Sequence, residues 1–427
     1  MTGLPDGWRN ACLYDIAQVT LGQSPPGNTY NSDGRGVPFF QGKSEFTATY
    51  AEVRKYTTAG TKFAAGGDIL ISVRAPVGPT NIAPVDCAIG RGLAGLRAED
   101  GLDQRYLFWA LRATEHELAS HGAGSTFPAI TGKQLKSHRI NVAPLHEQLQ
   151  IVDILEDHLS RLDAGFRGLG ETIERLRLLR VSSLAHNVRS QDESENDSLM
   201  FGDQALALAP GWASGFVAQT AELVEYGTSS KTHVGQLPGD VPVLRMGNVK
   251  DGRLVWGSLK YLASDIPGLQ KIMLRPGDLL FNRTNSAEHV GKSAVFEGER
   301  EAAAFASYLI RVRFRPEVDP RWASMVINSP YGRAYVTSVT SQQVGQANVN
   351  GTKLKAFPLP IPPLDAQIAR IGRHAETIDR ADRLFDEVQR AKQRLQSLRR
   401  SLLSAAFSGR LTGRTSDMEL VEEMAGV

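Results

Sequence analysis

Cysteine is almost absent from this chain: its 427 residues include only Cys12 and Cys87. Two cysteines give neither a disulfide framework nor a set of zinc ligands. No apolar run approaches the roughly 20 residues that span a bilayer, and the polar start, Met1–Asn10, does not resemble a signal peptide. We therefore expect a cytoplasmic protein with no membrane segment and no metal site.

An excess of one charge is also missing. Lys and Arg number 48 and Asp and Glu 46, so the net charge is only +2. Because non-specific DNA binding depends on positive charge, the composition alone does not indicate a nucleic-acid partner. Hydrophobic residues at 41% and charged residues at 22% are typical of a globular protein, and the length allows two or three domains.

Enzyme motifs fail where they are approached. Gly42-Lys43-Ser44 resembles the end of a phosphate-binding loop, but Val37 stands where that loop requires glycine. Phe166–Gly170 imitates a methyl-donor-binding FxGxG loop without a strand before it. The histidines His116, His121 and His138 lack metal-ligand spacing. We expect no catalytic residues in this chain.

What the sequence does contain is a tandem repeat. Gly7-Trp8 recurs as Gly211-Trp212, and Gly67–Leu70 (GDIL) recurs as Gly277–Leu280 (GDLL). Further matches follow in the same order: Val37-Pro38 with Val241-Pro242, Thr131–Lys136 with Asn350–Lys355, Pro144-Leu145 with Pro363-Leu364, and Gln148 with Gln367. Matches by chance would not keep the same order in both halves, so the sequence predicts two copies of one structural unit.

Each copy ends in a long helix with an apolar seam of coiled-coil spacing. The first helix would be ~60 Å long at ~1.5 Å per residue. Gly165, Gly168 and Gly170 in the first helix, and His374 and Lys392 in the second seam, depart from the pattern. The two helices are predicted to pair through Leu159, Leu162, Phe166, Leu176, Ile378, Phe385, Val388 and Leu395.

The segments before the helices are predicted to be mixed α/β. Strands are expected at Val37–Gln41, Asp68–Val73, Val243–Met246 and Asp278–Phe281, and helices at Gln104–Ser120 and Arg321–Ser329 with Asp103 and Asp319 as caps. The expected divisions are 1–144, helix 145–189, linker 190–207, 208–362, helix 363–410 and a flexible tail 411–427.

Such a repeat favours pairing about a pseudo-two-fold axis, with antiparallel helices that hold a globular head at each end. Heads held apart in this way suit two half-sites on one DNA duplex. The alternative is that the helices are ordinary amphipathic helices in separate cores, although their length argues against it.

The duplicated motifs resemble those of the specificity subunits of Type I restriction-modification systems. The resemblance covers residues 5–412 and is carried by Gly67–Arg74 (GDILISVR), Gly277–Arg283 (GDLLFNR), Asn141–Gln148 (NVAPLHEQ), Pro360–Gln367 (PIPPLDAQ) and Ala405–Thr412 (AAFSGRLT). It implies an α+β fold with two mixed α/β target-recognition domains in a pseudo-two-fold repeat, separated by two long antiparallel helices that form a coiled coil.

The resemblance also implies a function. A specificity subunit is not catalytic; it reads a bipartite double-stranded DNA target for two modification (methyltransferase) subunits and two restriction (endonuclease and translocase) subunits. S-adenosylmethionine, ATP and magnesium would be used by those partners, with no cofactor in this chain. The rival interpretations are a stand-alone methyltransferase or nuclease, and a coiled-coil scaffold that holds two copies of a partner without binding DNA.

Polar loop residues are the candidates for reading DNA, because Arg can fork onto guanine, Asn and Gln onto adenine, and Lys meets phosphate. Arg74 and Arg283 recur in both copies and are the strongest. The first copy offers Ser24, Lys43, Ser44, Arg74, Thr80, Asn81, Ser125 and Thr126; the second offers Lys231, Arg245, Asn248, Arg283, Thr284, Asn285, Lys292 and Gln343.

Overall fold

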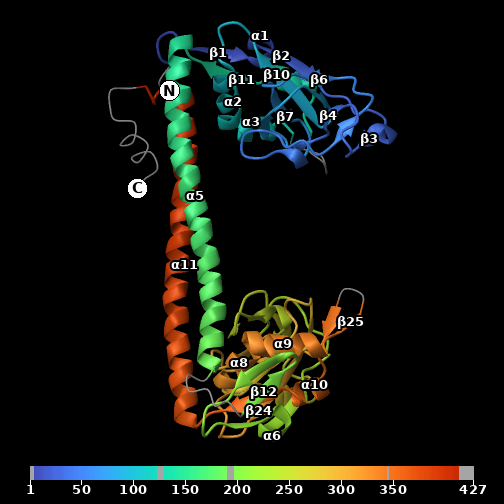
Figure 1. The fold of residues 1–427 in the computed structure, drawn as a ribbon, viewed down its shortest axis with the longest axis vertical. Helices are drawn as coiled ribbons and strands as arrows, with labels where there is room; N and C mark the ends of the chain where they lie inside the picture. Colours follow the sequence, from blue (N-terminus) through green and yellow to red (C-terminus); the bar gives the residue numbers. More distant parts are fainter. Residues whose placement is uncertain (1–3, 123–128, 190–196, 344–345, 413–427) are drawn as a thin grey trace. The chain divides into compact units, whose positions relative to one another are not determined.

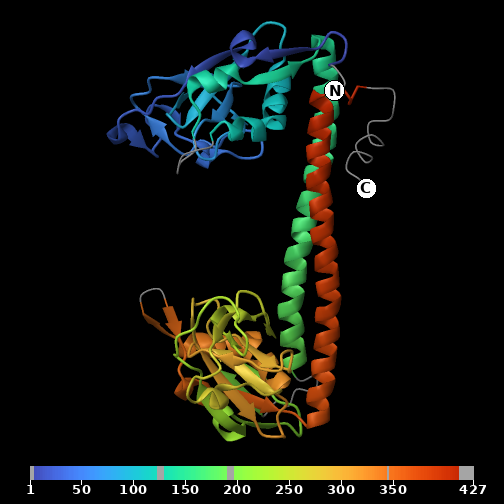
Figure 2. The same ribbon diagram turned by 180° about the vertical axis from the view of Figure 1, so that it is seen from behind.

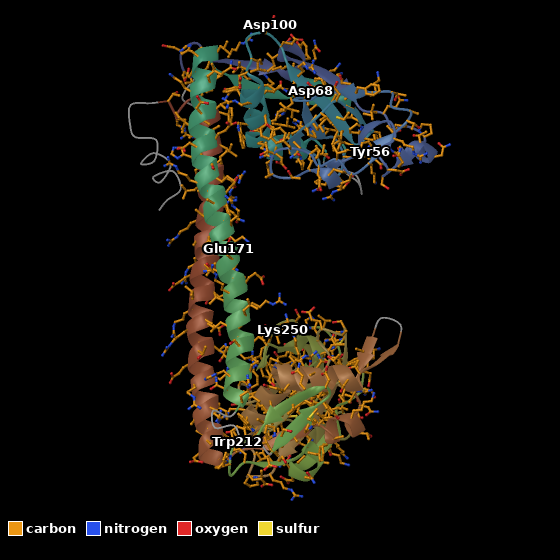
Figure 3. The ribbon with its side chains drawn as sticks, in the orientation of Figure 1. Tyr56, Asp68, Asp100, Glu171, Trp212 and Lys250 are labelled. Carbon is orange, nitrogen blue, oxygen red and sulfur yellow. The ribbon has the colours of Figure 1, made fainter. Side chains whose placement is uncertain are left out.

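The computed structural model describes residues 4–122, 129–189, 197–343 and 346–412. Within them the chain forms two compact units, residues 1–171 with 388–427 and residues 172–387. Each unit therefore combines one globular head with parts of both long helices, and Glu171 on the first helix ends the first unit's N-terminal segment (Figure 3).

The first head is built on a four-stranded antiparallel sheet in the order β2-β10-β7-β8. A second sheet has the order β3-β5-β4-β9-β6, and β1 pairs with β11 beside the long helix α5 (Figure 1). The elements are β1 Arg9–Cys12, α1 Leu13–Ile16, β2 Ala17–Leu21, β3 Tyr30–Asn31, β4 Val37–Phe40, β5 Tyr56–Thr57, β6 Phe63–Ala64, β7 Ile69–Ser72, β8 Thr80–Ile82, β9 Cys87–Ile89, β10 Leu93–Ala98, α2 Gln104–Ala113, α3 Glu115–Ser120, α4 Gly132–Ser137, β11 Arg139–Val142 and α5 Leu145–Val188.

The second head repeats this topology. Its four-stranded sheet has the order β15-β24-β20-β22, and β14 pairs with β27 as β1 does with β11. The elements are β12 Ser198–Phe201, β13 Gln204–Ala207, β14 Ala213–Phe216, α6 Val217–Thr220, β15 Ala221–Tyr226, β16 Val241–Leu244, β17 Val249–Lys250, β18 Arg253–Leu254, β19 Lys260–Leu262, α7 Leu269–Ile272, β20 Asp278–Asn282, β21 Thr284–Asn285, β22 Ser293–Phe296, β23 Ala304–Phe305, β24 Leu309–Phe314, α8 Pro320–Asn328, α9 Pro330–Val339, β25 Ser341–Gln343, β26 Gln346–Asn348, α10 Gly351–Lys355, β27 Pro358–Ile361 and α11 Leu364–Phe407.

The predicted strands and helices are confirmed within a few residues, as are both predicted caps. The Asp103 carboxylate accepts a hydrogen bond from the Tyr106 amide at 2.9 Å, and Asp319 accepts one from the Arg321 amide at 2.8 Å. Each carboxylate satisfies an amide that the first turn of α2 or α8 would otherwise leave unpaired.

The long helices are antiparallel within each unit (Figure 2). In the first unit Asp163 of α5 binds Arg399 of α11 at 2.6 Å, whereas the earlier residue Glu147 accepts a hydrogen bond from the later residue Thr412 at 2.7 Å. In the second unit Arg180 binds Asp382, and the later Asn187 meets the earlier Arg370. The predicted fold class, two mixed α/β domains with long antiparallel helices, is confirmed.

The predicted helix seam lies on the inner faces. Leu159, Leu176, Ile378 and Val388 are buried, and Leu162, Phe166, Phe385 and Leu395 are partly buried. The helix α5 runs without a break through its three glycines. A Cβ on Gly165 would lie 3.2 Å from Leu395 Cδ1, so this glycine allows a close approach of α11.

Two predicted boundaries are wrong. Residues 198–207, expected to be part of a linker, form the hairpin β12-β13, and its Phe201 and Leu206 are buried in the second core. The linker residues 190–196 lie outside the described part of the chain. Leu411 and Thr412, expected to open a flexible tail, belong to the first unit, because Leu411 is buried in the first core and Thr412 is bonded to Glu147.

Candidate nucleic-acid interface

In each head the candidate side chains gather at one edge of the four-stranded sheet. Because neighbouring strands are antiparallel, β2 and β7 end at the edge where β8 and β10 begin. The same edge of the second head collects the ends of β15 and β20 and the starts of β22 and β24. We call these the first and second loop edges.

Matching hydrogen bonds build both loop edges. The Gly22 amide donates to Leu93 at 3.0 Å in the first head, and the Gly227 amide donates to Leu309 at 3.3 Å in the second. A Cβ on either glycine would collide with carbonyl oxygens of the connection between β9 and β10 or between β23 and β24. Glycine lets the strand leave the sheet at that point.

A third loop joins each edge through the parallel pair β4-β9 or β16-β23. The Gly90 amide donates to Phe40 at 2.8 Å, which brings the segment 41–44 to the first loop edge. The Ala306 amide donates to Leu244 at 2.9 Å and brings Arg245 to the second. The segments that carry Ser24, Lys43, Ser44 and Arg74 therefore lie at the first loop edge, and those that carry Arg245, Arg283 and Thr284 lie at the second.

The first loop edge presents three exposed cationic side chains. Lys43, Arg74 and Arg91 are exposed, and the Arg91 amide donates to Ser24 Oγ at 3.2 Å. Arg91 was missed in the sequence analysis because it stands alone in the short turn between β9 and β10. The antiparallel order of the sheet supplies the signal that would have found it.

The second loop edge holds its arginine more firmly. The Arg283 guanidinium lies 5.0 Å from the centre of the Tyr226 ring and donates from Nη1 to the Ser307 carbonyl at 3.3 Å. Its Nε is buried without a partner in the described structure. Because an unpaired buried donor is costly, this nitrogen is suited to a ligand or water that completes its hydrogen bonds.

A polar hollow of about 170 Å³ lies at the second loop edge, between the segment after β15 and the start of β24. Tyr308 is exposed on its rim and was missed in the sequence analysis. Its lining residues are Thr228, Ser229, Ser230, Thr232, Arg245, Ala306, Ser307 and Tyr308.

Two candidates of the first head are used internally. Asn81 is fully buried, and its Nδ2 donates to the Thr47 carbonyl at 2.9 Å. Thr80 is buried, and its carbonyl accepts a hydrogen bond from Arg112 at 3.3 Å. Burial lowers the pKa of Arg112 to about 10. Neither Thr80 nor Asn81 is placed to touch a macromolecule, while Ser125 and Thr126 lie outside the described residues.

In the second head Asn248 is likewise buried. Its amide closes a turn by donating to Val255 at 2.7 Å and to Gly257 at 3.1 Å, and it accepts from the Arg245 amide at 2.9 Å. Its side-chain hydrogen bonds are thus directed at the head itself, and Asn248 is not placed to contact DNA.

The remaining candidates of the second head surround its loop edge. Lys231 is exposed, and Lys292 is partly buried with its Nζ 3.9 Å from Asp251. Thr284 accepts a hydrogen bond from Asn348 at 2.8 Å, so β21 is tied to the hairpin β25-β26, which projects from the head (Figure 1). Asn285 accepts a hydrogen bond from the Ser286 amide, and the side chain of Gln343 lies outside the described residues.

Comparison with known proteins agrees with this architecture. The profile of the Type I restriction modification DNA specificity domain matches residues 5–174. The type I restriction enzyme MjaX specificity subunit of Methanocaldococcus jannaschii is 44% identical over 156 residues, which are 36% of this chain and 37% of that protein. The StySPI specificity subunit of Salmonella potsdam is 24% identical over 78% of this chain and 70% of its own length.

Residues 5–174 therefore match a Type I DNA specificity domain, and most of the chain is similar to Type I specificity subunits. A solved chain from a study of complex assembly and conformational transition in a type I R-M system has the same fold, with a TM-score of 0.74 and 20% identity over 96% of this chain and 100% of that one. The second head carries the same four-stranded sheet as the first head, which lies within the matched residues.

Two further features of the described residues bear on other functions. No three His, Cys, Asp or Glu side chains among them gather into a metal-binding group. No helix among them is long and apolar enough to cross a membrane.

Proposed function

We propose that this chain is the DNA-reading subunit of a Type I restriction-modification complex, with one half-site read at each loop edge. The observation that carries the proposal is that equivalent edges of two equivalent sheets bear different polar side chains. Lys43, Arg74 and Arg91 stand at the first edge, and Arg245, Arg283 and Thr284 stand at the second.

The chemistry of these groups suits DNA. Exposed Lys and Arg side chains bind phosphates, and an arginine that stacks on an aromatic ring can present its fork to the edge of guanine. Different donors and acceptors at the two edges favour different base sequences. The target is therefore proposed to be bipartite and asymmetric.

The chain is proposed to position catalysts and to perform no reaction itself. Methyl transfer with S-adenosylmethionine, and cleavage that needs ATP and magnesium, are assigned to the modification and restriction subunits. We propose that the complex acts in the cytoplasm.

A repeated apolar surface supports two copies of one partner. Leu145 and Leu149 open α5, and Leu364 and Ile368 stand at the matching positions that open α11. All four side chains are between 44% and 52% exposed. Exposed apolar pairs at equivalent positions offer two equal docking sites, and we assign them to two modification subunits. Two restriction subunits complete the proposed complex.

The test measures DNA binding by the chain alone and with its modification subunit, by gel shift against a randomised duplex library. We expect selection of two unlike short sequences at a fixed separation. The double variant Arg74→Ala, Arg283→Ala should weaken binding at least tenfold and reduce its salt dependence, because two cationic contacts are lost. Arg161→Ala, an exposed change on α5, is the matched control. Partner binding without any DNA selection would favour the protein scaffold instead.

A further inference from the structure

The first head contains a polar hollow of about 380 Å³ that lies outside the loop edges. Its acidic walls are Asp68, labelled in Figure 3, and Asp86. Arg97 donates from Nε to Asp68 Oδ1 at 2.7 Å, and the Gly66 amide donates to Asp86 Oδ1 at 2.8 Å. The complete lining is Gln18, Thr20, Phe63, Ala64, Ala65, Asp68, Asp86, Gly95 and Arg97.

The same place in the second head is occupied by a side chain. Strands β10 and β24 correspond from Leu93 and Leu309 onward, so Gly95 corresponds to Arg311. The strand partners agree, since Gly95 pairs with Thr20 and Arg311 pairs with Glu225. The second head thus fills with its own arginine the space that the first head leaves open.

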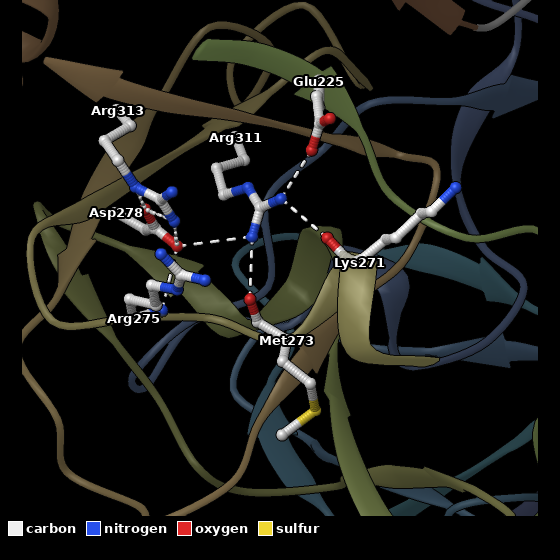
Figure 4. Close-up of polar contacts among 7 residues, drawn as sticks. All are labelled: Glu225, Lys271, Met273, Arg275, Asp278, Arg311 and Arg313. Atoms are coloured by element: carbon white, nitrogen blue, oxygen red, sulfur yellow. Dashed lines mark hydrogen bonds and ion pairs between the residues drawn. The ribbon is translucent and has the colours of Figure 1, made fainter. Parts of the chain in front are cut away.

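The contacts of Arg311 show which groups surround a guanidinium at this place in the second head (Figure 4). Its Nη1 donates to the Met273 carbonyl at 2.7 Å and lies 3.4 Å from Asp278 Oδ2. Its Nη2 donates to Glu225 at 2.5 Å and to the Lys271 carbonyl at 2.8 Å. Asp278 is the counterpart of Asp68, and its second guanidinium partner, Arg313, is the counterpart of Arg97.

The hollow of the first head and the Arg311 site of the second head differ by one cationic side chain. In the second head, Asp278 and Glu225 face Arg311 and Arg313. In the first head, Asp68 and Asp86 face Arg97 alone. The volume is about thirteen times the roughly 30 Å³ share of one water, so the hollow admits a group of several atoms.

We propose that this hollow binds a guanidinium group supplied by another molecule, either an arginine side chain or a small guanidine compound. A planar fork matches the two carboxylates, which lie just before β7 and just before β9. A compact ammonium matches them less well. The half-exposed Phe63 ring on the lining adds a face on which a guanidinium stacks. The head's own chain is poorly placed to supply the group, because a Cβ on Gly95 would lie 3.2 Å from Ala64 Cβ.

The test titrates the full chain, labelled with ¹⁵N-glycine, with ethylguanidine and follows the Gly95 amide, whose resonance is identified by its loss in Gly95→Arg. We expect a saturable shift with a dissociation constant of roughly 1 mM. Ethylammonium should bind at least tenfold more weakly. Asp86→Asn should weaken ethylguanidine binding at least fivefold, whereas Asp100→Asn, an exposed carboxylate of the same head outside the hollow, should leave it unchanged.

The proposal is overturned by the absence of a saturable shift, by equal binding of the two cations, or by an Asp86→Asn variant that binds as wild type. A second arm rests on the proposed function and uses the complex with modification subunits. An arginine of that partner in the hollow predicts that ethylguanidine no longer binds the complex and that Asp86→Asn weakens assembly. A small guanidine ligand predicts unchanged titration and assembly. The first arm uses no DNA, so its failure is separate from failure of DNA recognition.

Discussion

Gln148 and Gln367 occupy the same turn of their long helices and make the same three hydrogen bonds. Each side-chain oxygen accepts from the amide of a capping aspartate, Asp103 or Asp319, and each side-chain nitrogen donates to two carbonyls. Gly95 and Arg311 also correspond, yet one opens a hollow and the other fills it. The two units thus share the glutamine that joins each long helix to its head. They differ at the strand position where one has glycine and the other has arginine.

The helix pair shows the same division. In the first unit Leu155 and Leu402 are buried in the core, whereas their counterparts in the second unit are His374 and Ser183, joined by a hydrogen bond of 2.8 Å. The predicted departure at His374 is therefore a polar pair in place of an apolar one. The contacts between the two long helices are therefore polar at this position in the second unit and apolar in the first.

The largest effect is expected from Arg311→Leu. This change removes the guanidinium that Asp278 and Glu225 share. Because Asp278 keeps Arg313, the cost should lie at the lower end of the about 3–5 kcal/mol for breaking a buried ion pair. Hydrogen exchange should accelerate in β24 and β20 but not in β10. Arg97→Leu, which removes an exposed partner, is the control and should cost at most about 1 kcal/mol. Equal losses for the two variants would contradict the contrast between the hollow of the first head and the Arg311 site.

Gln148→Met and Gln367→Met should each cost about 1–3 kcal/mol, because each leaves a buried capping amide without an acceptor. The two losses should be similar and confined to the variant's own unit. Urea unfolding followed by hydrogen exchange would measure both. Gln150→Met, an exposed change on the same helix, controls for the loss of a glutamine. A large loss for one variant and none for the other would break the equivalence of the units.

Acid should act on each unit through a different histidine. Burial lowers the pKa of His138 and of His374 to about 4, and their counterparts are Phe357 and Leu155. An unfolded histidine titrates near 6.5, so the unfolded state binds protons first as the pH falls. The free energy of unfolding should therefore fall as the pH is lowered from about 6.5 toward 4. Each histidine should contribute at most about 1.4 kcal/mol per pH unit to this fall.

His138→Phe should remove this acid dependence from the first unit only, and His374→Leu from the second only. Chemical unfolding at pH 7, 6 and 5 with unit-resolved hydrogen exchange provides the measurement. An unchanged pH dependence in both variants would show that other groups govern it.

The smallest effect is expected from the helix glycines. Gly170→Ala should stabilise α5 by about 0.5–1 kcal/mol, since a Cβ there meets nothing within 4 Å. Gly165→Ala should gain less, because its Cβ would press on Leu395. Thermal unfolding would rank the pair, and a greater gain at Gly165 would show that the helices are not closely apposed there.

The sequence predicted the elements whose patterns are local. Caps at Asp103 and Asp319, the helix starts after Pro144 and Pro363, and the four main strands follow from residue types and spacing over a few positions. The hairpin β12-β13 was missed because its two core side chains, Phe201 and Leu206, stand in a short segment after an acidic stretch.

The loop edges could be predicted only in part. A polar residue in a Gly- and Pro-rich segment is equally compatible with an exposed contact and with the buried amides of Asn81 and Asn248, since both satisfy polar groups near turns. The Arg311 site was missed because the paired strands that form it lie far apart in sequence. The repeated pairs Gly67-Asp68 and Gly277-Asp278 supply one acidic residue of each site and are a local sequence feature that both heads share.

The most direct test of independent reading exchanges residues 208–362 for the equivalent segment of a related specificity subunit and maps methylated sites by methylome sequencing. The first loop edge is untouched by the exchange, so one half of the methylated sequence should stay as it was and the other half should change. A matched exchange of residues 1–144 should alter the opposite half. If either exchange altered both halves, or neither, the two heads would not be separate readers of DNA.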